Sequence, residues 1–165
     1  MNFFKSPKKS LGQNFLMDQN IINKIIKIGN IKKNKTVLEI GPGRGSLTRE
    51  IVNINPKKIF AVEKDFKLTS ILKENYKNFK NVKVVNDDIL NFIKNKSLGN
   101  NVIVYGNLPY NISTQILASL ILLEKWPPWY EVLIFMFQKE VADRIIARNN
   151  SNNYGRLSIL SNWRL

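Results

Sequence analysis

Short apolar runs recur along the chain at the spacing expected of buried strands. They are TVLEI at 36–40, KIFAV at 58–62, VKVVN at 82–86, NVIVY at 101–105 and EVLIFMF at 131–137. Helical patterns lie between them at about 46–54, 66–76, 113–124 and 138–148, and residues 88–96 can form a short helix. This alternation predicts an α/β fold, in which a mostly parallel sheet is covered by helices on both faces.

Another helix is expected before the first strand, with Asp18 as its N-cap. Its apolar stripe consists of Ile21, Ile22, Ile25, Ile26 and Ile28. Because 165 residues with 44% hydrophobic content supply one sizeable core, we predict a single domain. Within it, an N-terminal helical segment covers about 1–30 and an α/β core covers about 31–165.

The composition removes several classes of reaction. The chain has no Cys and no His, so it lacks a thiolate nucleophile, the usual base of triad hydrolases and the common zinc ligands. We expect no metal site. No apolar run approaches the roughly 20 residues of a membrane span, and no apolar stretch follows the lysines of Met1–Ser10 as it does in a signal peptide. We therefore expect a soluble, cytoplasmic protein that does not contact membranes.

The chain is strongly basic. It has 26 Lys and Arg residues against 12 Asp and Glu residues, a net charge of +14. Such a charge favours a polyanionic partner, and nucleic acid is the obvious candidate. A biased genome composition is an alternative source of the many lysines, although it does not explain why acids are so few. The sequence does not single out the basic residues that contact RNA; candidates are Lys5, Lys8, Lys9, Arg144, Arg148 and Arg156.

Glycines and acids follow the first three predicted strands, where a parallel sheet binds its ligands. The first strand leads into Glu39, Gly41, Gly43 and a further glycine at 45. Glu63 follows the second strand at the spacing from which a carboxylate reaches both hydroxyls of a ribose. An acid at 87 or 88 follows the third strand and can accept a hydrogen bond from an adenine amine. The pattern predicts a nucleoside pocket; alternatively, the glycines only form a tight turn and the acids are solvated strand ends.

The charge of this predicted pocket indicates which nucleoside it binds. A dinucleotide fingerprint needs G-x-G-x-x-G/A, but Ser46 occupies its third glycine position. Carboxylates also repel a pyrophosphate and attract a cation. S-adenosylmethionine carries a sulfonium and an ammonium group but no phosphate. We therefore predict S-adenosylmethionine as the cofactor, in preference to NAD.

The fourth predicted strand ends in Asn107, Leu108, Pro109 and Tyr110. An aromatic amine is a poor nucleophile because its lone pair is delocalised into the ring. An asparagine oxygen and a backbone carbonyl that accept its two N–H groups favour a more tetrahedral nitrogen. The adjacent tyrosine offers a face on which a base can stack. The motif predicts methylation of an exocyclic amine; taken alone, it also fits a strand-to-helix turn with a buried tyrosine.

Six segments spread over almost the whole chain extend these motifs. They are LGQNFLMD (11–18), LEIGPGRGSLT (38–48), VEKD (62–65), NLPYNIST (107–114), FQKEVADRI (137–145) and YGRLS (154–158). Together they resemble the KsgA-type ribosomal RNA adenine dimethyltransferases. The resemblance implies a Rossmann-like class I methyltransferase fold that dimethylates N6 of two adjacent adenines in small-subunit ribosomal RNA during ribosome biogenesis. Small-subunit ribosomal RNA is then the expected partner, and we expect a monomer.

The resemblance also implies the role of individual residues. The predicted cofactor contacts are Gln13, Asn14, Leu16, Glu39, Gly41, Gly43, Glu63, Lys64, Asp88, Ile89 and Asn107. The predicted catalytic group that holds the target adenine is Asn107, Leu108, Pro109 and Tyr110. Of these contacts, Asn14 and Leu16 come from the resemblance alone.

Members of this family are longer, with further strands and a C-terminal helical domain that is absent from these 165 residues. We therefore expect a shortened catalytic domain, with the fifth strand left at the edge of the sheet and with weak or absent transfer to ribosomal subunits. Two alternatives remain. One is the related enzyme class that dimethylates large-subunit ribosomal RNA and confers macrolide resistance. The other is a non-catalytic RNA-binding assembly factor that uses only its basic surface.

Overall fold

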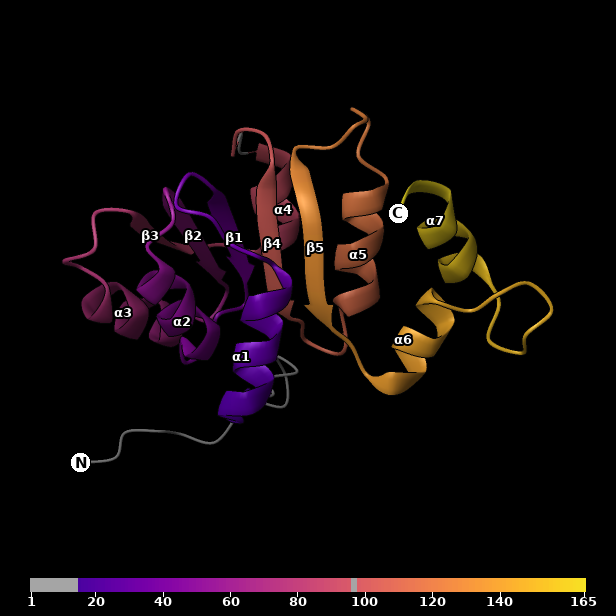
Figure 1. Cartoon of the computed structure of the whole chain (residues 1–165), viewed down its shortest axis with the longest axis horizontal. Coiled ribbons are helices and arrows are strands. Elements are labelled where there is room, and N and C mark those ends of the chain that lie inside the picture. Colours follow the sequence, from indigo (N-terminus) through magenta and orange to yellow (C-terminus); the bar gives the residue numbers. More distant parts are fainter. Residues whose placement is uncertain (1–14, 96–97) are drawn as a thin grey trace.

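A five-stranded parallel sheet forms the centre of the protein, in the order β3-β2-β1-β4-β5 (Figure 1). The computed structural model describes residues 15–95 and 98–165. The strands are β1 (Thr36–Ile40), β2 (Lys58–Glu63), β3 (Val82–Asn86), β4 (Val102–Asn107) and β5 (Tyr130–Met136). The strand order changes direction between β1 and β4, so the carboxyl ends of these two neighbours lie at the topological switch point.

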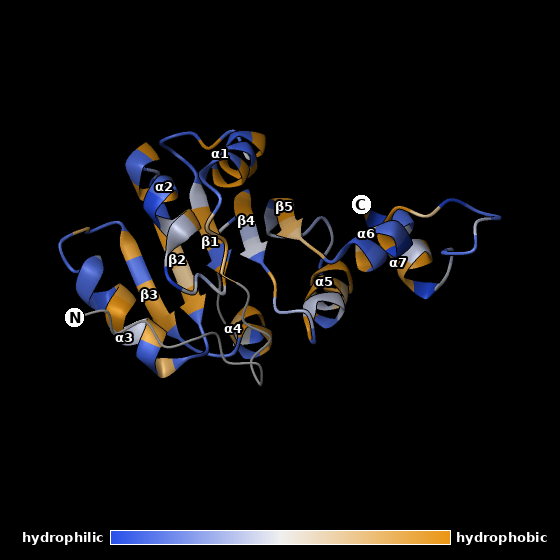
Figure 2. Cartoon of the chain, turned by 90° about the horizontal axis from the view of Figure 1, so that it is seen from below, coloured by the Kyte–Doolittle hydropathy of each residue, from blue (hydrophilic) through white to orange (hydrophobic). Residues whose placement is uncertain are grey.

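Helices cover both faces of the sheet. They are α1 (Gln19–Ile28), α2 (Ser46–Ile54), α3 (Phe66–Asn75), α4 (Ile89–Asn95), α5 (Ser113–Ile121), α6 (Lys139–Ile145) and α7 (Arg156–Arg164). The pair α1 and α2 lies on one face and the pair α4 and α5 on the other, while α6 and α7 lie beyond β5 (Figure 2). None of the helices within the described ranges combines the length and apolar character that crossing a membrane requires.

Two apolar clusters hold these layers together. On one face, Ile22 of α1 and Ile51 of α2 pack against Val37 of β1. On the other, Phe92 of α4 and Ile116 of α5 pack against further strand residues. Because the β1 side chains alternate between the two clusters, the sheet is buried on both faces, as its continuous apolar runs predict.

The predicted strands and the βα alternation are confirmed, and the short helix expected within 88–96 is α4. Asp18 caps α1 as predicted, because its carboxylate accepts hydrogen bonds from the N–H groups of Asn20 and Ile21. The predicted apolar stripe of α1 is wider than the buried one. Ile22 is fully buried, whereas 69% of Ile28 is exposed because it lies in the last turn of the helix.

The strand β5 pairs only with β4 among the described residues, so it occupies an edge of the sheet as expected. Its residues from Val132 to Met136 are half-buried. Beyond this edge, α7 packs against both α5 and α6. The edge also carries an ion pair between Lys35 and Glu131, which joins the loop before β1 to the start of β5. α6 follows the carboxyl end of β5 in the chain, and α7 packs between it and α5.

Candidate functional site

The turn after β1 is shaped by glycines in the left-handed region. Gly41 has φ +63° and Gly43 has φ +59°, values that a residue with a side chain rarely adopts. A Cβ at Gly43 would lie 3.1 Å from the Phe15 ring, whereas nothing within the described ranges lies within 4 Å of one at Gly41. The Gly41 N–H donates to the Val62 carbonyl at 2.9 Å, which fixes the turn to β2. With respect to the described residues, the backbone at Gly41 is therefore open to close approach by a ligand.

Glu63 ends β2 and connects this glycine turn to the next loop. Its Oε2 accepts the Gly43 N–H at 3.0 Å, and its Oε1 accepts the Asp65 N–H at 2.9 Å. The side chain is buried, and burial raises the pKa of its carboxyl while backbone hydrogen bonds, foremost those from Asp65 and Gly43, oppose that rise. A carboxylate has about four acceptor positions, so about two remain for a ligand.

Glu39 lies deeper, in the floor of the same site. Only 1% of this residue is exposed, and its Oε2 accepts a hydrogen bond from Thr48 Oγ1 at 2.7 Å. Burial raises the pKa of the Glu39 carboxyl to about 7; the Thr48 hydrogen bond opposes this rise and the nearby Glu63 charge adds to it. The carboxyl groups of Glu39 and Glu63 therefore interact electrostatically at the carboxyl ends of β1 and β2.

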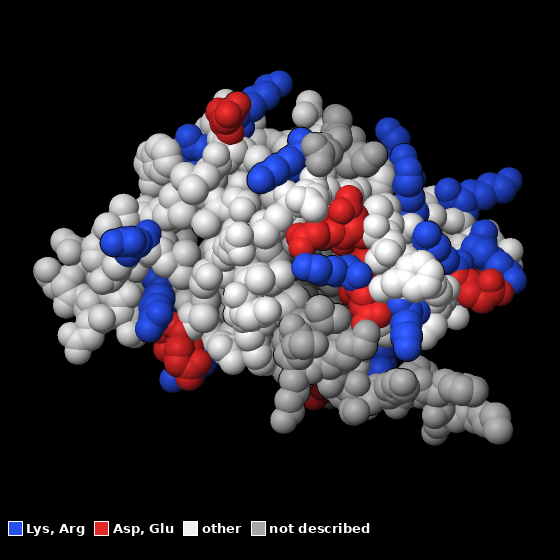
Figure 3. Space-filling model, turned by 180° about the vertical axis from the view of Figure 1, so that it is seen from behind, with Lys and Arg blue, Asp and Glu red and all other residues white. Residues whose placement is uncertain are grey.

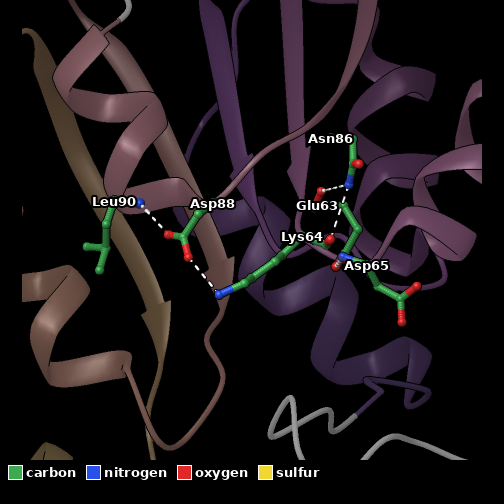
Figure 4. Close-up of polar contacts among 6 residues, drawn as sticks. All are labelled: Glu63, Lys64, Asp65, Asn86, Asp88 and Leu90. Carbon is green, nitrogen blue, oxygen red and sulfur yellow. Dashed lines mark hydrogen bonds and ion pairs between the residues drawn. The ribbon is translucent and has the colours of Figure 1, made fainter.

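Asp88 lies across the site from these acids, at the start of α4 (Figure 4). Its Oδ1 accepts the Leu90 N–H at 2.9 Å, and its Oδ2 pairs with Lys64 Nζ at 2.8 Å. The hydrogen bond from Lys64 holds the pKa of the Asp88 carboxyl below its usual value. Asn86 stabilises the turn after β2, because its side-chain amide donates hydrogen bonds to the Glu63 and Lys64 carbonyls at 2.9 and 3.1 Å.

One face of the molecule carries a central group of acidic side chains (Figure 3). Figure 3 shows acidic side chains near the middle of that face, with a basic side chain next to them and other Lys and Arg side chains spread around them. No group of three or more Asp or Glu side chains within the described ranges is arranged to hold a metal ion. The site is therefore a local concentration of carboxyl groups in a chain of net charge +14.

The predicted catalytic segment begins where β4 ends. Ile40 pairs with Gly106, so the turn after β1 and the segment from Asn107 leave the sheet side by side. Leu108 is buried in the core and anchors the segment, while 44% of Tyr110 is exposed. The Pro109 carbonyl accepts the Ile112 N–H at 3.2 Å. The Leu108 carbonyl, by contrast, accepts no hydrogen bond from any residue in the described part of the chain.

A cavity of about 210 Å³ adjoins this segment. Asn107 and Tyr110 line it from the β4 side, and Met136 and Phe137 line it from the end of β5. Residues 15–18, which precede α1, close a third side. The cavity therefore has a polar amide, an exposed aromatic ring and apolar walls, which suits a flat base that carries an exocyclic amine.

The structure brings together most of the residues that the sequence predicts for the site. Gly41, Gly43, Glu39 and Glu63 are linked by hydrogen bonds or by charge, and the Lys64–Asp88 ion pair lies beside them. Leu16 lines the same cavity as Asn107 and Tyr110. The side chain of Ile89 lies in the core, so any contact from Ile89 to a ligand is through its backbone. Gln13 and Asn14 lie outside the described residues.

Sequence reasoning missed three features of the site. Thr48 of α2 holds the Glu39 carboxyl, and the spacing of nine residues between them gives no signal on its own. Phe15 contacts the glycine turn, where the Arg44 guanidinium lies 4.4 Å from the centre of its ring. Met136 and Phe137 form one wall of the cavity; their position at the end of a predicted strand beside Asn107 is the signal that could have found them.

Comparison with known sequences gives a match over almost the whole chain. The family described as ribosomal RNA adenine dimethylase matches residues 4–164. The ribosomal RNA small subunit methyltransferase A of Pelagibacter ubique is 52% identical over 98% of this chain, and that of Nitrobacter winogradskyi is 43% identical over 96%. The chain spans 61% and 56% of the length of these two relatives.

Solved structures show the same fold. A dimethyladenosine transferase from Plasmodium falciparum superimposes with a TM-score of 0.75 at 31% identity, covering 89% of this chain and 51% of the other. The 23S rRNA methyltransferase ErmE superimposes with a TM-score of 0.72 at 29% identity, covering 90% of this chain and 55% of the other. The predicted Rossmann-like methyltransferase fold is thereby confirmed.

Proposed function

Because the chain belongs to the ribosomal RNA adenine dimethylase family, we propose that it carries the site of an enzyme that dimethylates N6 of two adjacent adenines in small-subunit ribosomal RNA. The proposal includes S-adenosylmethionine as the methyl donor and a role in ribosome biogenesis, as a monomer in the cytoplasm. The observation that supports it most is the juxtaposition of the acid-lined glycine turn with the cavity beside Asn107 and Tyr110.

The acid-lined edge of the sheet fits the cofactor. The open backbone at Gly41 would receive its methionine part, and the free acceptor positions of Glu63 would receive the ribose hydroxyls. Asp88 would accept the adenine amine beside its pair with Lys64. Neighbouring carboxyl groups favour a cation, and burial strengthens that preference. When bound, the cofactor supplies an electrophilic methyl group on a sulfonium centre.

The Asn107 segment fits the target base. The Asn107 side-chain oxygen and the Leu108 carbonyl are the two acceptors for the amine N–H groups, and the core packing of Leu108 holds that carbonyl in place. Such acceptors are more effective when the nitrogen becomes tetrahedral than when it is planar, so they lower the barrier to methylation. The exposed Tyr110 ring offers the stacking surface for the adenine.

Relatives favour the small subunit over the other candidates. The curated relatives at 52% and 43% identity carry the name small subunit methyltransferase, whereas the 23S rRNA methyltransferase is 29% identical. A purely RNA-binding assembly factor would need neither the carboxylates of the cofactor site nor the Asn107 amide. We therefore propose adenine dimethylation of small-subunit RNA over these two alternatives.

Two measurements test the proposal. Isothermal titration should detect S-adenosylmethionine binding to the chain, and Glu63→Gln should weaken it. Mass spectrometry of small-subunit particles from cells that lack the gene should show loss of N6,N6-dimethyladenosine, and the unmodified gene, but not Asn107→Ala, should restore it. Loss of methylation in large-subunit RNA instead would show that the enzyme acts on large-subunit RNA and not on small-subunit RNA. No change in either RNA would favour the assembly factor.

A further inference from the structure

A second cavity lies between α6 and α7. Its volume is about 490 Å³, and it is lined by Arg144 of α6, Arg156 of α7 and the residues that connect these helices. Thr114, in the first turn of α5, also lines this cavity. We call this cavity, defined by Thr114, Arg144, Tyr154 and Arg156, the α6–α7 pocket. None of these four residues contributes to the methyl-transfer site described above.

The charge of the α6–α7 pocket favours an anion. Arg144 and Arg156 are exposed, and within the described ranges neither forms an ion pair with an acidic side chain. Among the described residues, no Asp or Glu lines the pocket. Two guanidinium groups that face one cavity without a carboxylate partner match the geometry and charge of a phosphate group. Residues of the first turn of α7 line the same cavity.

The pocket also offers contacts for a base. Tyr154 is 37% exposed and lines the same cavity as the two arginines. An exposed aromatic ring beside cationic side chains is the combination with which proteins bind single-stranded nucleic acid. Two side-chain amides, from Asn152 and Asn153, provide donors and acceptors for base edges without a charge.

The pocket is held in shape by a buried hydroxyl. Ser158 of α7 is fully buried, and its Oγ donates to the Arg144 carbonyl while it accepts the Gly155 N–H at 3.2 Å. One side chain therefore ties α6 to the start of α7. This pre-formed geometry reduces the ordering cost of binding a ligand.

Two chain segments lead from the cavity beside Asn107 to this pocket. Tyr110 and Phe137 line the first cavity, while Thr114 and Val141, each four residues later, line the second. Four residues span at most about 14 Å even when fully extended. The two cavities are therefore close enough for neighbouring nucleotides of one strand to reach both.

We propose that the α6–α7 pocket binds the nucleotide next to the target adenine, with its phosphate on Arg144 and Arg156 and its base on Tyr154. This inference rests on the proposed function, because it places the strand that the methyl-transfer site would act on. The pocket holds that strand while the target base occupies the cavity beside Asn107. Arg144, Tyr154 and Arg156 are thus positioning residues for the RNA.

The test measures the binding of a fluorescein-labelled, ten-nucleotide single-stranded RNA with two adjacent adenines at its centre. Fluorescence anisotropy is recorded without cofactor at several salt concentrations. The double variant Arg144→Gln with Arg156→Gln is compared with Arg148→Gln, an exposed arginine that does not line the pocket. Each lost phosphate contact lowers the slope of log affinity against log salt by about 0.7. Both arginines hold the same phosphate, so the double variant should lose about 0.7 of this slope, and Arg148→Gln should keep the original slope.

Tyr154→Leu should weaken RNA binding by about 5-fold or more without changing the salt slope, whereas Tyr154→Phe should bind like the original chain. Thermal denaturation checks that the variants fold. Equal slopes for the original chain and the double variant, or no RNA binding by the original chain at low salt, would overturn the pocket assignment. Isothermal titration with S-adenosylmethionine is carried out in parallel. If the cofactor does not bind, the proposed function is contradicted, but the anisotropy result still tests whether the α6–α7 pocket binds RNA.

Discussion

Replacing the buried acid in the floor of the site, Glu39→Gln, should change how the stability of the protein depends on pH. Burial raises the pKa of this carboxyl from 4.5 to about 7. Between these two values the carboxyl is protonated in the folded chain and ionised in the unfolded chain. The unfolded state then binds fewer protons, so the free energy of unfolding falls as the pH rises. The step from 4.5 to about 7 corresponds to about 3 kcal/mol.

Urea denaturation, followed by tryptophan fluorescence at pH 4.5, 6 and 7.5, measures this effect. The unmodified chain should lose about 3 kcal/mol more over this range than Glu39→Gln, because the amide stays neutral and can still accept the Thr48 hydrogen bond. Glu124→Gln, at an exposed position, is the control and should follow the unmodified chain. The same pH dependence in the unmodified chain and in Glu39→Gln would refute the assignment of a protonated acid in the floor of the site.

Three further predictions concern the same region. Lys64→Met should return the pKa of Asp88 toward its usual value in an NMR titration, and should change the free energy of unfolding by less than about 1 kcal/mol because the ion pair is largely exposed. Gly106→Ala should destabilise the chain by about 1–3 kcal/mol in thermal denaturation, since its Cβ would lie 2.5 Å from Leu108. Gly155→Ala has open space around it, so it should cost less than about 1 kcal/mol, from the poorer capping of α7 by alanine. Binding of S-adenosylmethionine at pH 6 should release protons, because a bound cation favours the ionised form of the buried carboxyl of β1; calorimetry in two buffers of different ionisation enthalpy measures the release.

The sequence was sufficient to predict the strands and their parallel arrangement, because most strands are short apolar runs between turn residues, although Lys83 interrupts the run of β3 and the strand order was not predicted. The glycines at 41 and 43 and the acids at 39, 63 and 88 follow those runs directly, so their meeting at one edge follows from the parallel topology. The strand β4 extends two residues beyond its predicted end at 105, because Gly106 and Asn107 continue the pairing with β5.

Contacts between distant side chains could not be predicted in this way. Periodicity places Thr48 on α2 but does not show that its hydroxyl reaches the Glu39 carboxyl. Likewise, Tyr105 is predicted as a strand residue, but its hydroxyl donates to the Ile26 carbonyl of α1 at 3.1 Å. That contact needs the Gly29 backbone close by, since a Cβ there would lie 1.8 Å from the Tyr105 oxygen. Such pairs depend on how helices pack on the sheet, which no local pattern records.

A crystal structure of the chain with S-adenosylmethionine tests the proposed methyl-transfer site most directly. The ligand should lie with its ribose on Glu63, its adenine beside Asp88 and its methyl group directed into the cavity next to Asn107. A ligand bound at any other part of the surface, or turned so that its methyl group points away from that cavity, would contradict the proposed site.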